Sequence, residues 1–107
     1  MALTRDFRET IVARVQRDQA FRRELFGQGV ESLLLGELEV GKSILRDYIN
    51  ATIGFQKLST AVAIPEKSLL RMFGPAGNPQ AKKLFRVMAY LQKREGIRLE
   101  VKPRKAA

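Results

Sequence analysis

Apolar residues recur every three or four positions along most of the chain, and this spacing predicts α-helices nearly throughout. Two helices are expected before Gly36, the first with Thr4 as its N-cap and the second with Asp18. Gly27 and Gly29 fall inside the second helix, where each glycine costs about 1 kcal/mol relative to alanine, so a bend or break is expected there.

The pattern continues through three further helices, expected over residues 38–52, 55–62 and 66–73. Ile64-Pro65 interrupts the periodicity between the last two, and proline there suits the first turn of the helix that follows. The positions expected to form the buried stripe of the helix over 38–52 are Val40, Ile44, Tyr48 and Ala51, with Leu45 and Ile49 beside them.

A sixth helix is expected to start with Asn78 as its cap and Pro79 in its first turn, and to stop at Gly96. Residues 97–102 then alternate strictly between apolar and charged side chains, as in a half-buried β-strand. Because one strand cannot stand alone, it must pair within the chain, with a second copy in a homodimer, or with a partner. The apolar residues of this strand are Ile97, Leu99 and Val101.

The charge of the chain is divided unevenly. Residues 1–52 hold eight Lys/Arg and eight Asp/Glu, whereas residues 53–107 hold twelve Lys/Arg and three Glu, so the whole net charge of +9 lies in the second half. This asymmetry favours a polyanion partner for that half, nucleic acid first, over a basic surface that only aids solubility.

Several classes of chemistry lack their usual residues. The chain has no histidine, the commonest general base and metal ligand, and no cysteine for disulfides or thiol chemistry. We therefore expect no enzyme, no catalytic residue, no metal site and no cofactor. No run of 18 apolar residues occurs, and the N-terminus MALTRDFRET has no apolar secretion signal, so a cytoplasmic protein without a membrane span is expected.

One stretch does match a nucleotide-binding motif. GELEVGKS, residues 36–43, fits the phosphate-binding loop pattern G-x-x-x-x-G-K-[ST] at every position. That loop needs a strand before it and a helix after it, whereas an amphipathic helix precedes Gly36 and two glutamates lie where phosphates would bind. We interpret Gly36 as a helix end and expect Lys42 to face solvent on the next helix.

The stretch from Phe55 to Gly74 carries a better supported mechanism. Its two short helices meet at a tight turn, as in a helix-turn-helix, whose second helix enters the major groove of DNA. The apolar positions that would join these helices are Leu58, Val62, Ile64, Leu69 and Met72.

Polar residues around this motif are the predicted DNA contacts. Arg71 can bond guanine bidentately, Lys67 can reach guanine or phosphate, and Leu70 can touch a thymine methyl. Glu66 can accept a hydrogen bond from cytosine. The residues expected to meet phosphate are Lys57, Lys82, Lys83 and Arg86, together with the backbone amides of Gln80 and Ala81.

The blocks LRDYINATIGF and SLLRMFGPAGNP also carry a family resemblance, which extends over about residues 7–101. The chain resembles the HigA-like addiction-module antidotes, antitoxins with a helix-turn-helix of the phage-repressor type. The resemblance implies that Pro65, Glu66, Lys67, Ser68 and Arg71 lie on the recognition helix.

The sequence departs from the phage-repressor pattern at three positions. Phe55 stands where a phosphate-binding glutamine is usual, and Gln56 is the residue that could replace it. Ala63 replaces the turn glycine, at a cost of about 1 kcal/mol if it is left-handed. Ser59 replaces a small alanine.

The resemblance implies a fold and two tasks. The expected fold is an all-α, repressor-like domain: an N-terminal helical extension (1–36), a helix-turn-helix DNA-binding part (37–96), and a C-terminal strand with a basic tail (97–107). The chain would bind operator DNA as a dimer and repress transcription. It would also neutralise a toxin related to RelE/ParE-like ribonucleases.

Two alternatives stay open at this point. One is a stand-alone phage-like repressor without a toxin. The other is a basic RNA-binding or architectural protein, which the low aromatic content of 7% disfavours as a single-strand platform.

Overall fold

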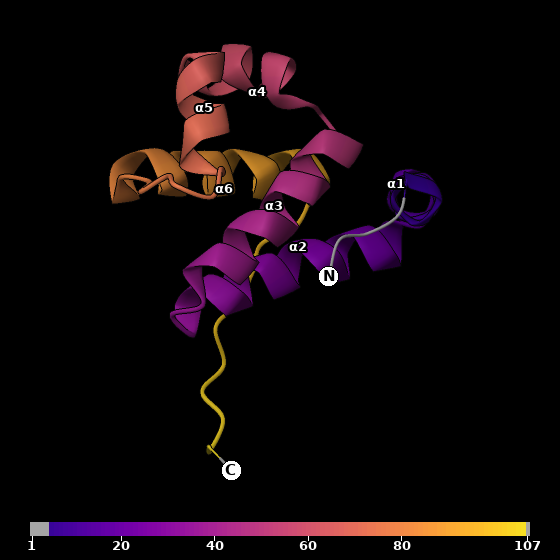
Figure 1. The fold of residues 1–107 in the computed structure, drawn as a ribbon. Helices are drawn as coiled ribbons and strands as arrows, with labels where there is room; N and C mark the ends of the chain where they lie inside the picture. The colour runs from indigo at the N-terminus through magenta and orange to yellow at the C-terminus, as the bar shows by residue number, and fades with distance from the viewer. Residues whose placement is uncertain (1–4, 107) are drawn as a thin grey trace.

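The computed structural model describes residues 5–106, which form six helices and no strand (Figure 1). This arrangement fits the expected all-α class, and Thr4, the expected first N-cap, lies outside the described residues. The helices in chain order are α1 (Arg5–Arg17), α2 (Gln19–Leu34), α3 (Leu38–Ala51), α4 (Phe55–Val62), α5 (Glu66–Met72) and α6 (Ala81–Glu95). None of these helices is long and apolar enough to cross a membrane.

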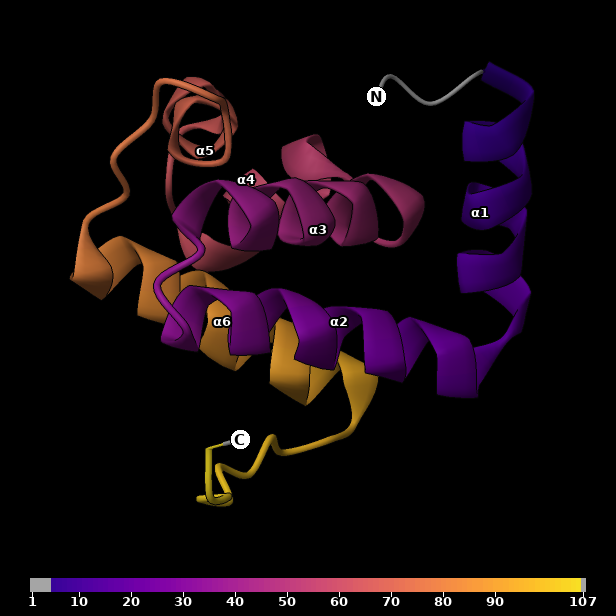
Figure 2. The ribbon, with the colours of Figure 1, turned by 60° about the horizontal axis from the view of Figure 1, so that its bottom comes forward.

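Helices α2 and α3 lie side by side, and α1 crosses one end of the pair (Figure 2). Two glycines set how closely α2 and α3 approach. A Cβ on Gly29 would lie 2.9 Å from Leu45 Cδ2, and one on Gly41 would lie 2.6 Å from Leu33 Cδ2. Helix α2 is continuous through Gly27 and Gly29, so the predicted bend or break is wrong; Gly29 is a close-packing position between helices.

The hydrophobic core lies where α2, α3, α4, α5 and α6 meet. Phe26 of α2 stacks on Tyr48 of α3 with ring centroids 5.1 Å apart. Leu45 and Ile49 are fully buried on α3, whereas Val40 is 51% exposed, so Val40 is wrong as a member of the buried stripe. Burial follows the row that Gly41 begins, because that row faces α2 at close range.

The predicted helix ends are mostly confirmed. The backbone N–H of Phe21 donates to Asp18 Oδ1 at 3.0 Å, and this hydrogen bond lowers the pKa of the Asp18 carboxyl. Gly96 ends α6 in the left-handed conformation with φ 74°. The expected start of α6 is wrong, because Gln80 occupies the N-cap position while Asn78 and Pro79 belong to the preceding loop.

The predicted C-terminal strand is also wrong. Residues 97–106 form an extended tail, and no other extended segment lies beside it in the part of the chain that the structure describes (Figures 1 and 2). Ile97 and Leu99 are partly buried against the core, and the Leu99 N–H donates to Gln92 Oε1 at 2.9 Å. The alternation at Ile97 and Leu99 therefore reflects packing of the tail on its own core.

Candidate nucleic-acid interface

Helices α4 and α5 are joined by a three-residue turn that is held by local hydrogen bonds. Ala63 adopts the left-handed conformation, with φ 56° and ψ 43°, which glycine adopts more easily. Ser59 Oγ donates to the carbonyl of Ile64 at 2.6 Å, and the Ile64 N–H donates to the carbonyl of Ser59 at 3.3 Å. Ser59 therefore closes the turn with its hydroxyl as well as its backbone carbonyl.

The division of α5 into a buried and an exposed side is confirmed. Leu69 is fully buried and Met72 is 7% exposed, whereas Glu66, Lys67, Leu70 and Arg71 face solvent. All five apolar positions expected to join the two helices are buried: Leu58, Val62, Ile64, Leu69 and Met72. Pro65 precedes the first residue of α5 and is exposed.

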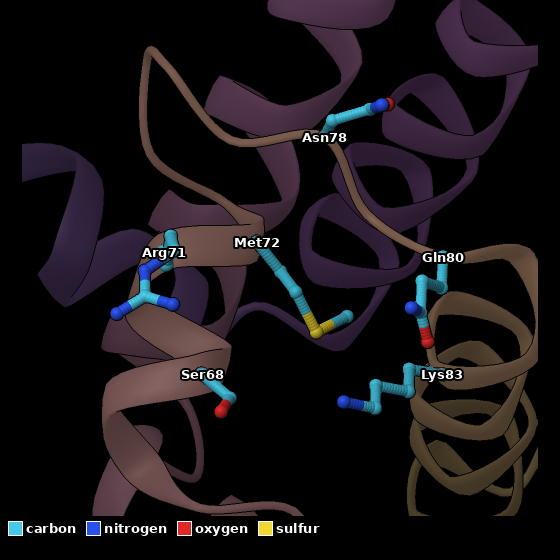
Figure 3. A pocket seen from close by; sticks show the side chains of 6 residues that line it. All are labelled: Ser68, Arg71, Met72, Asn78, Gln80 and Lys83. Atoms are coloured by element: carbon cyan, nitrogen blue, oxygen red, sulfur yellow. The ribbon is translucent and has the colours of Figure 1, made fainter.

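A hollow of about 160 Å³ separates α5 from the start of α6 (Figure 3). The ammonium group of Lys83 points across it toward Ser68, and the side chain of Gln80 projects beside Lys83 (Figure 3). The residues that line the hollow are Ser68, Arg71, Met72, Asn78, Gln80 and Lys83. Four of these were predicted DNA contacts, whereas Asn78 was expected only as a helix cap.

The remaining predicted contacts lie outside this hollow. Gln56 and Lys57 are exposed on the first turn of α4, and Lys82 is exposed on the first turn of α6. Arg86, expected on phosphate, donates from Nη1 to the carbonyl of Val62 at 3.2 Å. This hydrogen bond joins α6 to the C-terminal end of α4, next to the turn.

The position of Lys42 differs most from its prediction. Lys42 is 1% exposed, and the expectation that it faces solvent is wrong. The ammonium group donates to the carbonyls of Gly74 and Gly77, both at 2.8 Å, and pairs with Glu39 Oε2 at 3.0 Å. These three acceptors match the three N–H donors of an ammonium group. The hydrogen bonds and the ion pair offset the desolvation cost of burying the charge.

These contacts place Lys42 in a structural role. The residues after α5 form an irregular loop, 73–80, whose carbonyls must find donors if they are buried. Lys42 supplies two of those donors from α3, and Arg46 Nη1 adds a long contact of 3.5 Å to the Phe73 carbonyl. The lysine of GELEVGKS therefore holds the loop that carries Asn78 and Gln80, and its donors are not free to bind a phosphate.

Gly77 fits this loop against the end of α5. A Cβ at this position would lie 1.8 Å from the carbonyl oxygen of Arg71 and 3.0 Å from that of Met72. The Gly77 N–H also donates to the carbonyl of Gly74 at 3.1 Å. The loop thus meets the backbone of α5 directly, which fixes the distance between α5 and the start of α6.

The residues assigned to a dimer or partner strand do not form one surface. Ile97 and Leu99 contact the core of their own chain, and only Val101 is strongly exposed, at 77%. Within residues 5–106, no group of three acidic side chains comes together that could hold a metal ion. Comparison of the chain with protein-family models, curated proteins and solved structures finds no match.

Proposed function

We propose that this chain is a sequence-specific DNA-binding protein and the antitoxin of a bacterial type II toxin–antitoxin module, which represses its own operator. The observation that carries the DNA-binding half is the two-sided character of α5. Leu69 and Met72 anchor the helix, while Lys67, Leu70 and Arg71 project from it. A single exposed helix of this kind fits a major groove that is about 12 Å wide.

One kind of contact would supply affinity for DNA, and another would supply sequence specificity. Arg71 lies on α5 and would read a guanine, whereas Lys83 lies across the hollow on α6 and would meet the phosphate backbone. Phosphate contacts give affinity that falls with salt, and base contacts give specificity. The net charge of the half that contains both helices, +9, supports a polyanion partner.

The antitoxin half rests on the resemblance of the LRDYINATIGF and SLLRMFGPAGNP blocks to addiction-module antidotes. A stand-alone phage-like repressor would share the DNA-binding surface and would lack the protein partner. Direct binding between the purified chain and the product of the adjacent gene separates these two functions. Failure of that product to bind would remove the antitoxin half of the proposal.

The DNA-binding half is tested with the duplex upstream of the chain's own gene. Arg71→Ala is expected to weaken binding by about 1–3 kcal/mol and to relax one base position. Lys83→Ala is expected to weaken all sequences about equally and to reduce the salt slope by about 1. Lys93→Ala, an exposed lysine at the other end of α6, is the matched control and should bind like the parent. Parental binding by both the Arg71 and Lys83 variants would refute the assignment.

A further inference from the structure

A second surface, at the turn between α2 and α3, exposes an unusual amount of apolar area. We call residues 34–40 the tip. Of the eight large apolar side chains that the described residues leave exposed, four belong to the tip. They are Leu34, Leu35, Leu38 and Val40, which are 65%, 69%, 38% and 51% exposed. Clustered exposed apolar residues on one surface are typical of protein interaction sites, whereas scattered ones are not.

The charge of the tip is opposite to that of the rest of the molecule. The tip holds two glutamates, Glu37 and Glu39, and no lysine or arginine, in a chain whose net charge is +9. The next basic residue, Lys42, is buried; it pairs with Glu39 and offsets that charge, so Glu37 carries the remaining acidic charge of the tip. An acidic surface repels the DNA backbone, so the tip cannot extend the nucleic-acid interface. It complements a basic protein surface.

The backbone of the tip is held by hydrogen bonds within the chain. The N–H groups of Leu35 and Glu37 donate to the carbonyls of Glu31 and Ser32 at 3.0 and 2.9 Å, and Gly36 takes a φ of +82°. Close packing at Gly41 then fixes α3 against α2. A preformed surface loses little conformational entropy on binding, which favours affinity.

We propose that the tip is the docking surface for a protein partner whose contact face is apolar at its centre and basic at its rim. This inference rests on the antitoxin half of the proposed function and assigns the surface that the toxin would occupy. The tip adjoins the loop 73–80, because Glu39 pairs with Lys42, whose ammonium group donates to the carbonyls of Gly74 and Gly77. A partner on the tip would therefore lie close to the loop that carries Asn78 and Gln80.

The test measures binding of the adjacent gene's purified product to the full-length chain by calorimetry. Leu35→Asn removes an apolar contact and Glu37→Lys reverses a rim charge; each is expected to weaken binding about tenfold or more. The loss from Glu37→Lys should shrink at high salt, because screening weakens exposed charge pairs. Val101→Asn and Glu100→Lys are matched controls on the tail, at 77% and 63% exposure, and should bind like the parent.

The outcomes separate this inference from the function it rests on. If the product binds the parent and both tip variants equally, the docking surface is wrong and the antitoxin function stands. If the product does not bind the parent, both are overturned. If the tip variants change only the sedimentation of the chain alone, the tip is a contact between two copies and the inference is wrong. Binding of the variants to operator DNA, together with circular dichroism, must match the parent for a loss to support the docking surface.

Discussion

Two buried charged side chains, Lys42 and Glu95, stabilise different kinds of structure. Lys42 donates to main-chain carbonyls of an irregular loop, more than thirty residues away along the chain. Glu95 is 8% exposed at the end of α6 and accepts from side chains of helices α2 and α3. Lys42 fixes a loop that has no regular secondary structure. Glu95 joins helices that have their own backbone hydrogen bonds.

The partners of Glu95 show the second kind of connection. Arg22 Nε donates to both carboxylate oxygens, at 2.9 and 3.0 Å, and Arg22 Nη1 continues to the carbonyl of Val15 in α1 at 3.0 Å. The hydroxyl of Tyr48 donates to Glu95 Oε1. Burial, and then this hydrogen bond, raise the pKa of the Tyr48 hydroxyl. Loss of Glu95 should therefore loosen the whole bundle, whereas loss of Lys42 should displace the loop beside the candidate interface.

Gly77→Ala should have the largest effect, because the new Cβ would lie 1.8 Å from the Arg71 carbonyl oxygen. We expect the free energy of unfolding to fall by about 4 kcal/mol or more, as measured by urea denaturation. Gly27→Ala is the matched control, since its Cβ would meet nothing within 4 Å on α2. The control should gain about 0.5–1 kcal/mol. Equal stabilities for the two variants would show that the loop yields easily and that Lys42 does not hold it in a fixed place.

Lys42→Met comes next, with an expected loss of about 3 kcal/mol, because the carbonyls of Gly74 and Gly77 would stay buried without a donor. Hydrogen exchange should show the loss of protection concentrated in residues 73–80. Glu39→Gln, whose side chain is 62% exposed, should change stability by less than about 0.5 kcal/mol. Loss of protection spread evenly over all six helices would contradict the local role of Lys42.

Glu95→Gln should cost about 2 kcal/mol, less than the lysine variant, because an amide oxygen can still accept one hydrogen bond. Here the loss of exchange protection should extend over α1, α2 and α6, the helices that Arg22 and Glu95 connect. A loss of exchange protection confined to the end of α6 would contradict the role of Glu95 in joining helices.

Tyr48→Phe should have the smallest effect at neutral pH, about 1 kcal/mol, because only one donor to Glu95 is removed. The raised pKa of Tyr48 gives this contribution a pH dependence. Above about pH 10 an unfolded tyrosine loses its proton while the folded one keeps it, so the stability of the parent falls with rising pH. The difference in unfolding free energy between parent and variant should therefore narrow from about pH 9 to pH 11. A constant difference would show that Tyr48 titrates normally in the folded protein.

The helices α4 and α5 and the turn between them could be predicted almost completely, because their determinants are local. The bounds of α4 agree with the expected 55–62, and Ala63 proves to be left-handed, the case for which a cost of about 1 kcal/mol is expected. Apolar spacing places Leu69 and Met72 inward and leaves Arg71 outward, since a short helix on a core has only one such orientation.

The role of Lys42 could not be predicted in the same way. Lysine is rarely buried. Its acceptors here are backbone carbonyls, which every residue has, so no residue type in the sequence indicates them. The burial of α3 followed Gly41, Leu45 and Ile49, because close approach to α2 at Gly41 decided which side faced inward. Hydrophobicity alone could not rank that row above the one containing Val40. The tail likewise has the alternation of a strand, although no strand forms within residues 5–106.

The burial of Lys42 has a consequence for its chemical reactivity. Amine-reactive reagents modify lysines whose ammonium group reaches water and can lose its proton, and the other seven lysines are exposed or half-buried. Lys42 becomes accessible only when the loop over Gly74 and Gly77 lifts away from it. Its rate of labelling, read by mass spectrometry beside that of the other lysines, therefore reports how often the loop opens, in the free protein and with DNA bound.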